Sequence, residues 1–123
     1  MYKRQVQLLH VTPVLPTADL KRDTEWYKTN LGFSILRMED GYAVLRRSKI
    51  FIHLQWHADT PDDPLLGGSV IKFFVKNISP LFDEFVDKGV VTVDKLRKNT
   101  PWGTNEFGSV SYTHLTLPTI CSV

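Results

Sequence analysis

Hydrophobic and polar positions near the start of the chain predict a strand followed by a helix. Bulky and polar side chains alternate over residues 6–15, which is typical of a strand, and Pro16 is expected to end it. An imperfect helical stripe follows, formed by Leu20, Trp26, Tyr27 and Leu31. The side chain of Thr17 or Asp19 can cap the start of this helix, and Gly32 can end it.

The same kind of alternation then predicts three strands in succession. They cover residues 33–39, 42–46 and 50–56. Turns are expected at Asp40-Gly41 and at Ser48, because these residue types suit the tight connection of a hairpin. The first half of the chain therefore has the order strand, helix, three strands.

The second half repeats this order after a linker, residues 57–68, that is rich in Asp, Pro and Gly. The expected elements are a strand over 69–76, a helix from Ser79 or Pro80 to Gly89, a strand over 90–93 and the start of another over 105–108. The helix carries Leu81, Phe82, Phe85 and Val86 on one face. This order indicates a βαβββ module followed by an incomplete second copy.

Both ends of the chain match the translation of a sequencing adapter. Residues 1–5 back-translate to GTG TAT AAG AGA CAG, with GTG as the start codon, and this DNA resembles the end of a transposase-based adapter. Its reverse complement, read in another frame with the usual adapter continuation, gives residues 110–119. We therefore interpret the chain as a metagenomic fragment. Residues 1–5 and 109–123 are adapter translation, and residues 6–108 are the evolved domain, with modules at about 6–57 and 68–108.

Composition narrows the class of protein. The 123 residues are 42% hydrophobic and 23% charged, which is typical of one globular domain and excludes a disordered or collagen-like chain. The net charge of +2 is too small to indicate a nucleic-acid partner, and without Lys3 and Arg4 the basic and acidic residues balance at 13 each. With no membrane-spanning run and no signal-peptide pattern, we expect a cytoplasmic protein without a membrane partner.

No arrangement of residues matches a known catalytic or metal-binding motif. Within residues 6–108, His10, His53 and His57 lack the paired spacing that brings imidazoles to one metal ion. A metal site at His53 would need two further ligands that the sequence does not identify. The single cysteine excludes a disulfide framework and a multi-cysteine zinc site, and no nucleophile motif or phosphate-binding glycine pattern is present.

Two aromatic residues stand in or directly beside a predicted turn. Trp102 stands in a Pro-Trp-Gly turn, and Tyr42 follows Gly41 in a predicted hairpin. Aromatic side chains that loops expose can stack on a flat ligand, whereas local packing beneath the loop is the alternative. Both residues are therefore candidates for a stacking surface.

Five short motifs occur in a specific order along residues 6–108. They are Thr12-Pro13-Val14-Leu15, Asp19-Leu20, Trp26-Tyr27, Leu31-Gly32-Phe33 and the stretch from Pro101 to Phe107. Together they resemble the bleomycin-resistance-protein branch of the glyoxalase/dioxygenase (vicinal oxygen chelate) superfamily. The resemblance implies an α+β fold in which paired βαβββ modules form a curved mixed sheet, here with an incomplete second module. It also implies a homodimer, often with an exchanged N-terminal strand, and ligand sites in grooves between subunits or modules.

The resemblance implies binding rather than catalysis. Metal-dependent relatives place histidines where this chain has Thr12 and, near the second position, Val70, and a carboxylate on a last strand that the adapter-like tail replaces. Glu106 lies too early for that role. We therefore expect no metal and no cofactor. The alternative is a metal-dependent lyase, isomerase or dioxygenase in which His53, His10 and a carboxylate converge.

The drug-binding branch sequesters a planar, cationic glycopeptide by stacking and charge complementarity. By position, Trp102 and Tyr42 match the aromatics that sandwich the flat part of the drug. The cleft is expected to be lined by His53 and Gln55 from the fourth strand and by Lys72 and Phe74 from the fifth. Lys72 departs from the pattern, since a cation repels a cationic drug. The expected function is sequestration of a bleomycin-type antibiotic in a dimer groove, which confers antibiotic resistance; a ligand-binding module with no resistance role is the other alternative.

Overall fold

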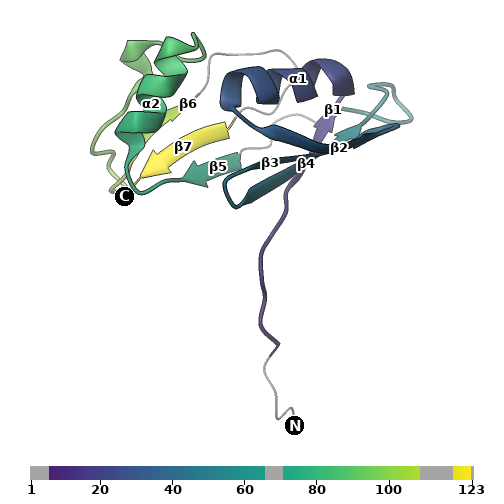
Figure 1. Ribbon diagram of the computed structural model, residues 1–123, viewed down its shortest axis with the longest axis horizontal. Helices are drawn as coiled ribbons and strands as arrows, with labels where there is room; N and C mark the ends of the chain where they lie inside the picture. Colours follow the sequence, from purple (N-terminus) through teal and green to yellow (C-terminus); the bar gives the residue numbers. More distant parts are fainter. Residues whose placement is uncertain (1–5, 66–70, 109–117, 123) are drawn as a thin grey trace.

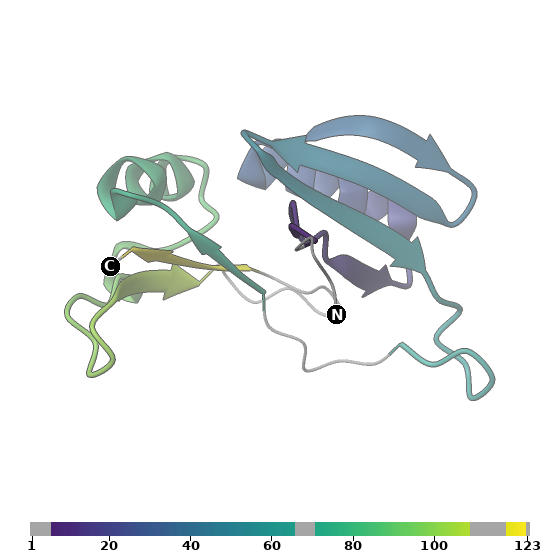
Figure 2. The same cartoon turned by 90° about the horizontal axis from the view of Figure 1, so that it is seen from below.

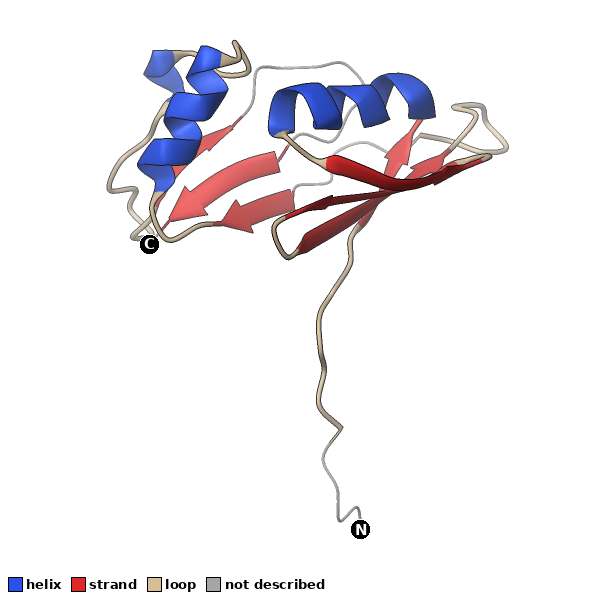
Figure 3. Ribbon diagram, in the orientation of Figure 1, coloured by secondary structure: helices blue, strands red, loops and turns tan. Residues whose placement is uncertain are grey.

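The computed structural model describes residues 6–65, 71–108 and 118–122, which form two sheets, each with one helix (Figure 1). The two sheets lie side by side, each with its own helix over it (Figure 2). Both helices lie on the same side of the strands (Figure 3). The predicted α+β class with a βαβββ first module is confirmed.

From the first helix onward, the first module follows the predicted boundaries closely. Its elements are β1 (Val14–Thr17), α1 (Leu20–Leu31), β2 (Ser34–Glu39), β3 (Tyr42–Arg47) and β4 (Ile50–Trp56), and the strand order is β1-β4-β3-β2. Asp19 caps α1, since its side chain accepts the backbone N–H of Arg22 at 3.1 Å. Gly32 ends the helix in the left-handed conformation, with φ of 72°, which a residue without Cβ adopts at low cost.

The second module has three described strands, in the order β5-β7-β6. Its elements are β5 (Ile71–Phe74), α2 (Ile78–Asp87), a short 3₁₀ helix (Val93–Lys95), β6 (Asn105–Gly108) and β7 (Pro118–Ser122). The helix begins one residue before the predicted Ser79, because Asn77 caps it by accepting the Ser79 N–H at 3.2 Å. Ser69 and Val70, the start of the predicted strand, lie outside the described residues, as do residues 1–5 and 109–117 of the adapter-like ends.

Strand β7 comes from the segment interpreted as adapter translation. It is parallel to β5 and antiparallel to β6, which is the place that β4 holds in the first module. Ile120 and Cys121 on this strand are buried. Beyond β6, the position of β2 is represented by an isolated bridge between Arg97 and Glu106. The C-terminal residues thus hold, in the second module, the strand position that β4 holds in the first.

The predicted strand over residues 6–15 is wrong for most of its length. Strand pairing begins at Val14, opposite His53, and residues 6–12 pair with no strand in the described part of the chain. Their apolar side chains, Val6, Leu8, Leu9 and Val11, are 85–89% exposed. Alternation gives a strand only where a partner satisfies the backbone hydrogen bonds. Pro16 does not end the strand but lies within β1, an edge strand that tolerates a missing N–H.

The predicted strand over residues 90–93 is also wrong. Val90 and Val91 are both buried, and the Val90 N–H donates to the Phe85 carbonyl at 2.9 Å. Gly89, with φ of 73°, turns the chain so that these residues close the end of α2. Their apolar character therefore reflects packing at a helix terminus and not pairing in a sheet.

One hydrophobic core cluster extends through both modules. Tyr27 and Leu31 of α1 lie over the first sheet, while Phe82 and Phe85 of α2 contact the ring of Phe107 in β6. The rings of Phe33 and Phe73 lie 5.8 Å apart and join the first module to the second. Since the helices cover one face of each sheet, the opposite faces are left to carry the candidate site.

Candidate functional site

The first sheet has a buried face under α1 and an open face opposite it. Ala43, Leu45, Ile52 and Leu54 are fully buried, and the residues between them point to the other side because successive side chains in a strand alternate. The open face of β3 and β4 therefore carries Tyr42, His53 and Gln55. These are three of the six residues that the sequence analysis selected.

Tyr42 and His53 are in direct contact on this face. The Tyr42 hydroxyl and His53 Nδ1 are 2.6 Å apart, and the two rings meet edge to face at 5.2 Å between centroids. Both side chains are half-buried at a hollow of about 180 Å³, which Arg37, Glu39 and Val44 also line. Gln55, which is exposed, pairs with Tyr42 across the strands. The hydrogen bond holds the Tyr42 ring in place, and the hollow beside it is a candidate contact surface.

The second sheet has the same two-faced organisation. Phe73, Phe107 and Ile120 face α2, whereas Lys72, Glu106 and Cys121 lie on the open face. Glu106, on the edge strand β6, accepts several side-chain hydrogen bonds on this face, although its position along the chain lies too early for a metal ligand of the family. It is only 7% exposed, which requires that its carboxylate be compensated by hydrogen bonds or charge.

Three side chains donate hydrogen bonds to the same oxygen of Glu106. Trp102 Nε1 and Thr104 Oγ1 lie 3.3 Å from Oε2, and Cys121 Sγ lies 3.7 Å from it. Desolvation opposes ionisation, but the hydrogen bonds and the nearby charge of Lys72 prevail and lower the pKa of Glu106 below its usual value. Burial, followed by the Glu106 charge, raises the pKa of the Cys121 thiol. The open face thus holds a fixed negative charge beside a neutral thiol.

Trp102 lies in a tight turn that returns toward the sheet. The Thr100 N–H donates to the Thr104 carbonyl at 2.8 Å, and the Thr104 N–H donates to Thr100 Oγ1 at 3.0 Å. The indole is 56% exposed, and the guanidinium carbon of Arg97 lies 5.4 Å from its ring centroid. The loop therefore presents a large aromatic surface at the edge of the buried carboxylate.

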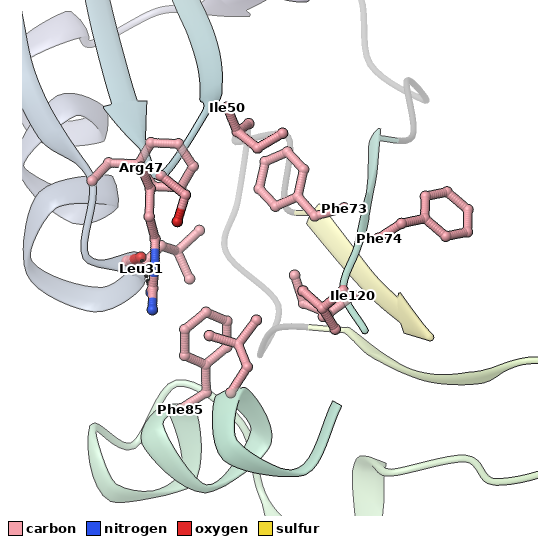
Figure 4. A pocket seen from close by; sticks show the side chains of 11 residues that line it. Leu31, Arg47, Ile50, Phe73, Phe74, Phe85 and Ile120 are labelled. Carbon is pink, nitrogen blue, oxygen red and sulfur yellow. Dashed lines mark hydrogen bonds between the residues drawn. The ribbon is translucent and has the colours of Figure 1, made fainter. Parts of the chain in front are cut away.

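Five of the six predicted residues fall into two groups in one chain, and the sixth, Phe74, lies opposite Cys121 on the open face of the second sheet. Tyr42, His53 and Gln55 share the first sheet, while Lys72 and Trp102 both interact with Glu106 on the second. Phe74 is exposed and is aimed away from its neighbour Phe73 (Figure 4). Among the described residues, no hydrogen bond, ion pair or ring contact links the Tyr42 group to the Trp102 group. The sandwich of one ligand between Tyr42 and Trp102 remains a prediction.

A separate apolar pocket lies between the two modules (Figure 4). It has a volume of about 160 Å³, and its lining includes Leu31, Ile50, Phe73, Phe85 and Ile120. The charged side chain on its wall, Arg47, is already bound: it donates to Glu84 at 2.8 and 2.9 Å and to the Leu31 carbonyl at 2.7 Å. A polar glycopeptide would find few groups to bind there, so this pocket is a less suitable site than the open faces.

The described residues contain no group of three His, Cys, Asp or Glu side chains placed to hold a metal ion. His57 instead pairs with Asp63, with Nδ1 and Oδ1 2.8 Å apart. This hydrogen bond is the main cause that lowers the pKa of Asp63. In the same residues, no helix is long and apolar enough to cross a membrane.

Comparison with known proteins identifies a family and similar proteins that carry the same family name. A family model described as the Glyoxalase/Bleomycin resistance protein/Dioxygenase superfamily matches residues 7–109. A bleomycin resistance protein of Geobacillus stearothermophilus is 26% identical over 117 residues, which cover 84% of this chain and 89% of that protein.

Solved structures show the same fold at lower identity. A bleomycin resistance determinant encoded on the transposon Tn5 superposes with a TM-score of 0.73 at 19% identity, covering 94% of this chain and 98% of that one. A bleomycin-binding protein from Streptomyces verticillus, complexed with copper(II)-bleomycin, gives a TM-score of 0.70 at 19% identity and covers 97% and 98%.

Proposed function

The chain belongs to the glyoxalase/bleomycin resistance protein/dioxygenase superfamily, and from this membership we propose that it is a non-enzymatic protein that binds and sequesters a bleomycin-type glycopeptide antibiotic. The curated relatives are bleomycin resistance proteins, and one similar structure contains bleomycin with copper. The observation that carries the proposal is the placement of an exposed Trp102 ring beside the buried carboxylate of Glu106.

This pair of groups suits a ligand that is flat and positively charged. The indole offers a stacking surface, and stacking of a flat ring on an aromatic side chain contributes about 1–3 kcal/mol. Glu106 contributes a negative charge that its hydrogen bonds keep ionised at neutral pH. Since the carboxylate is held in place before the ligand arrives, no further ordering of that side chain opposes binding.

We further propose that the binding groove is completed in a homodimer. The Tyr42 group and the Trp102 group lie on different sheets, so a second copy of the chain can bring one of each together. The exposed apolar side chains of residues 6–11 favour burial against such a copy. Sedimentation at the protein concentration used for binding should show a dimer; a monomer that binds the drug with full affinity would contradict this arrangement.

The binding proposal is tested by titrating the protein with metal-free bleomycin and following tryptophan fluorescence. The wild type should show saturable quenching at one drug molecule per chain. Trp102→Ala should raise the dissociation constant roughly 5- to 150-fold, the factor that corresponds to about 1–3 kcal/mol. Trp56→Phe is the matched control, because Trp56 lies on β4 with its Nε1 hydrogen-bonded to the Ala18 carbonyl. Equal affinity of the wild type and Trp102→Ala would refute the stacking role.

A further inference from the structure

The face of Trp102 is partly occupied by another side chain of the same protein. The guanidinium carbon of Arg97 lies 5.4 Å from the centroid of the indole, and Arg97 NH1 lies 3.8 Å from Oε1 of Glu106. A guanidinium is a planar cation, and it contacts an aromatic ring and a carboxylate at the same time. The position beside Trp102 and Glu106 therefore accepts a guanidinium group.

Backbone pairing holds Arg97 beside Glu106 and Trp102. Arg97 and Glu106 are opposite each other in an antiparallel bridge, and each donates its N–H to the other's carbonyl at 2.8 Å. Side chains that are directly opposite project to the same face. The turn at residues 100–104 connects them and returns the Trp102 indole over the pair. The contact therefore follows from the hairpin and does not depend on a distant part of the chain.

Arg97 is held loosely in comparison with its partner. Its side chain is 61% exposed, whereas that of Glu106 is 10% exposed. The distance of 3.8 Å is longer than a hydrogen bond, and exposed ion pairs contribute little to stability. The hydrogen bonds from Trp102 and Thr104 reach Oε2 of Glu106, whereas Arg97 lies near the other oxygen, Oε1, so those bonds do not involve Arg97. A competing cation can thus displace the guanidinium without disturbing the carboxylate.

We propose that Arg97 is an internal competitor of the ligand: it occupies the place on Trp102 and Glu106 that a planar cationic group of the ligand takes, and it leaves when the ligand binds. This inference rests on the proposed function and specifies the part of the ligand that is recognised, a guanidinium, an amidinium or an N-alkylated aromatic ring. Lys72 also acts on Glu106 through its charge, but an ammonium group lacks the flat surface that matches the indole. Removing the Arg97 guanidinium should therefore strengthen binding.

A small planar cation tests the inference separately from the drug. The 1-methylnicotinamide cation quenches tryptophan fluorescence on contact, and subtraction of the Trp102→Phe signal isolates the contribution of Trp102. Arg97→Gln should raise the quenching constant of Trp102 by about 3- to 30-fold, which matches the loss of one exposed cation–π contact and one exposed ion pair. Lys98→Gln is the matched control, since it removes the same charge from the next exposed residue. Equal quenching in the two variants would overturn the inference.

Titration with metal-free bleomycin separates the two proposals. Arg97→Gln should bind the drug more tightly than the wild type and Lys98→Gln, and the gain should vanish when Trp102→Phe is added. If the drug binds through Trp102 but Arg97→Gln brings no gain, the inference fails and the proposed function stands. If the small cation gains access in Arg97→Gln but no variant binds the drug, the proposed function fails and the internal competitor stands. Weaker drug binding by Arg97→Gln would make Arg97 a part of the site and overturn the inference.

Discussion

Replacing Glu84 with Gln tests what holds the two modules together. Glu84 on α2 accepts hydrogen bonds from both terminal nitrogens of Arg47 on β3, at 2.8 and 2.9 Å. The same guanidinium donates to the Leu31 carbonyl at the end of α1, at 2.7 Å. Arg47 therefore links the first sheet, the first helix and the second helix in one contact. The Gln side chain retains one acceptor oxygen but loses the charge and the second acceptor.

The size of the effect follows from the exposure of the pair. The side chains of Arg47 and Glu84 are 30% and 33% exposed, so the pair lies between an exposed ion pair, worth about 0–1 kcal/mol, and a buried charged hydrogen bond, worth about 1.5–3 kcal/mol. We expect Glu84→Gln to lower the free energy of unfolding by about 1–2 kcal/mol. For a domain of this size, this is a decrease in Tm of roughly 3–10 °C.

The same variant should respond to pH in a defined direction. Hydrogen bonds from Arg47, opposed by desolvation, hold the pKa of Glu84 below its usual value. A carboxyl whose pKa is lower in the folded state contributes stability above its unfolded pKa, about 4.3, and loses this contribution as the pH falls through the folded value. The difference in the free energy of unfolding between wild type and Glu84→Gln should therefore be largest at pH 7 and decrease at acidic pH.

Urea unfolding of wild type and variant at pH 7 and at about pH 3.5 measures both effects. Asp83→Asn is the matched control, because Asp83 is an exposed carboxylate on the same helix. The reasoning is refuted if Glu84→Gln is no less stable than Asp83→Asn at pH 7. A difference of the same size at both pH values would refute the role of the Glu84 charge.

Two further substitutions test the second sheet and the end of α1 by urea unfolding. Ile120→Ala should lower the free energy of unfolding by about 2–5 kcal/mol, because Ile120 is buried on β7. Thr119→Ala, on the opposite face of the same strand, should lower it far less. Similar values for the two variants would mean that β7 does not pair in this register. Gly32→Ala should lower the free energy of unfolding by about 1 kcal/mol or more, since the φ of 72° at this position suits glycine. An unchanged midpoint of urea unfolding would contradict the left-handed cap.

Local chemistry made much of the fold predictable from the sequence. Asp19 caps α1, Gly32 ends it, and Gly41 turns the first hairpin with φ of 79°. These residue types act through their own side chains or backbone conformations, so a short window of sequence is enough to identify them. The strand expected over residues 6–15 failed because alternation does not reveal whether a partner strand exists.

The candidate site was less predictable than the fold. The loop position of Trp102 and the hairpin position of Tyr42 identified both as candidate aromatics, and the resemblance gave His53 and Gln55. Glu106 and Arg97 were missed as part of the site, since their contact depends on the register of an antiparallel bridge. The spacing of two opposite charges about a Pro-Trp-Gly turn is the signal that could have revealed them.

The most direct test of the account is to record which tryptophan responds to the drug. In a ¹H–¹⁵N spectrum, the indole N–H signals of Trp26, Trp56 and Trp102 can be assigned by single Trp→Phe variants and followed during titration with metal-free bleomycin. We expect a large, saturable shift of the Trp102 signal, because this indole carries the proposed stacking surface and hydrogen-bonds to Glu106 at 3.3 Å. A Trp102 signal that stays in place while the drug binds would contradict this expectation.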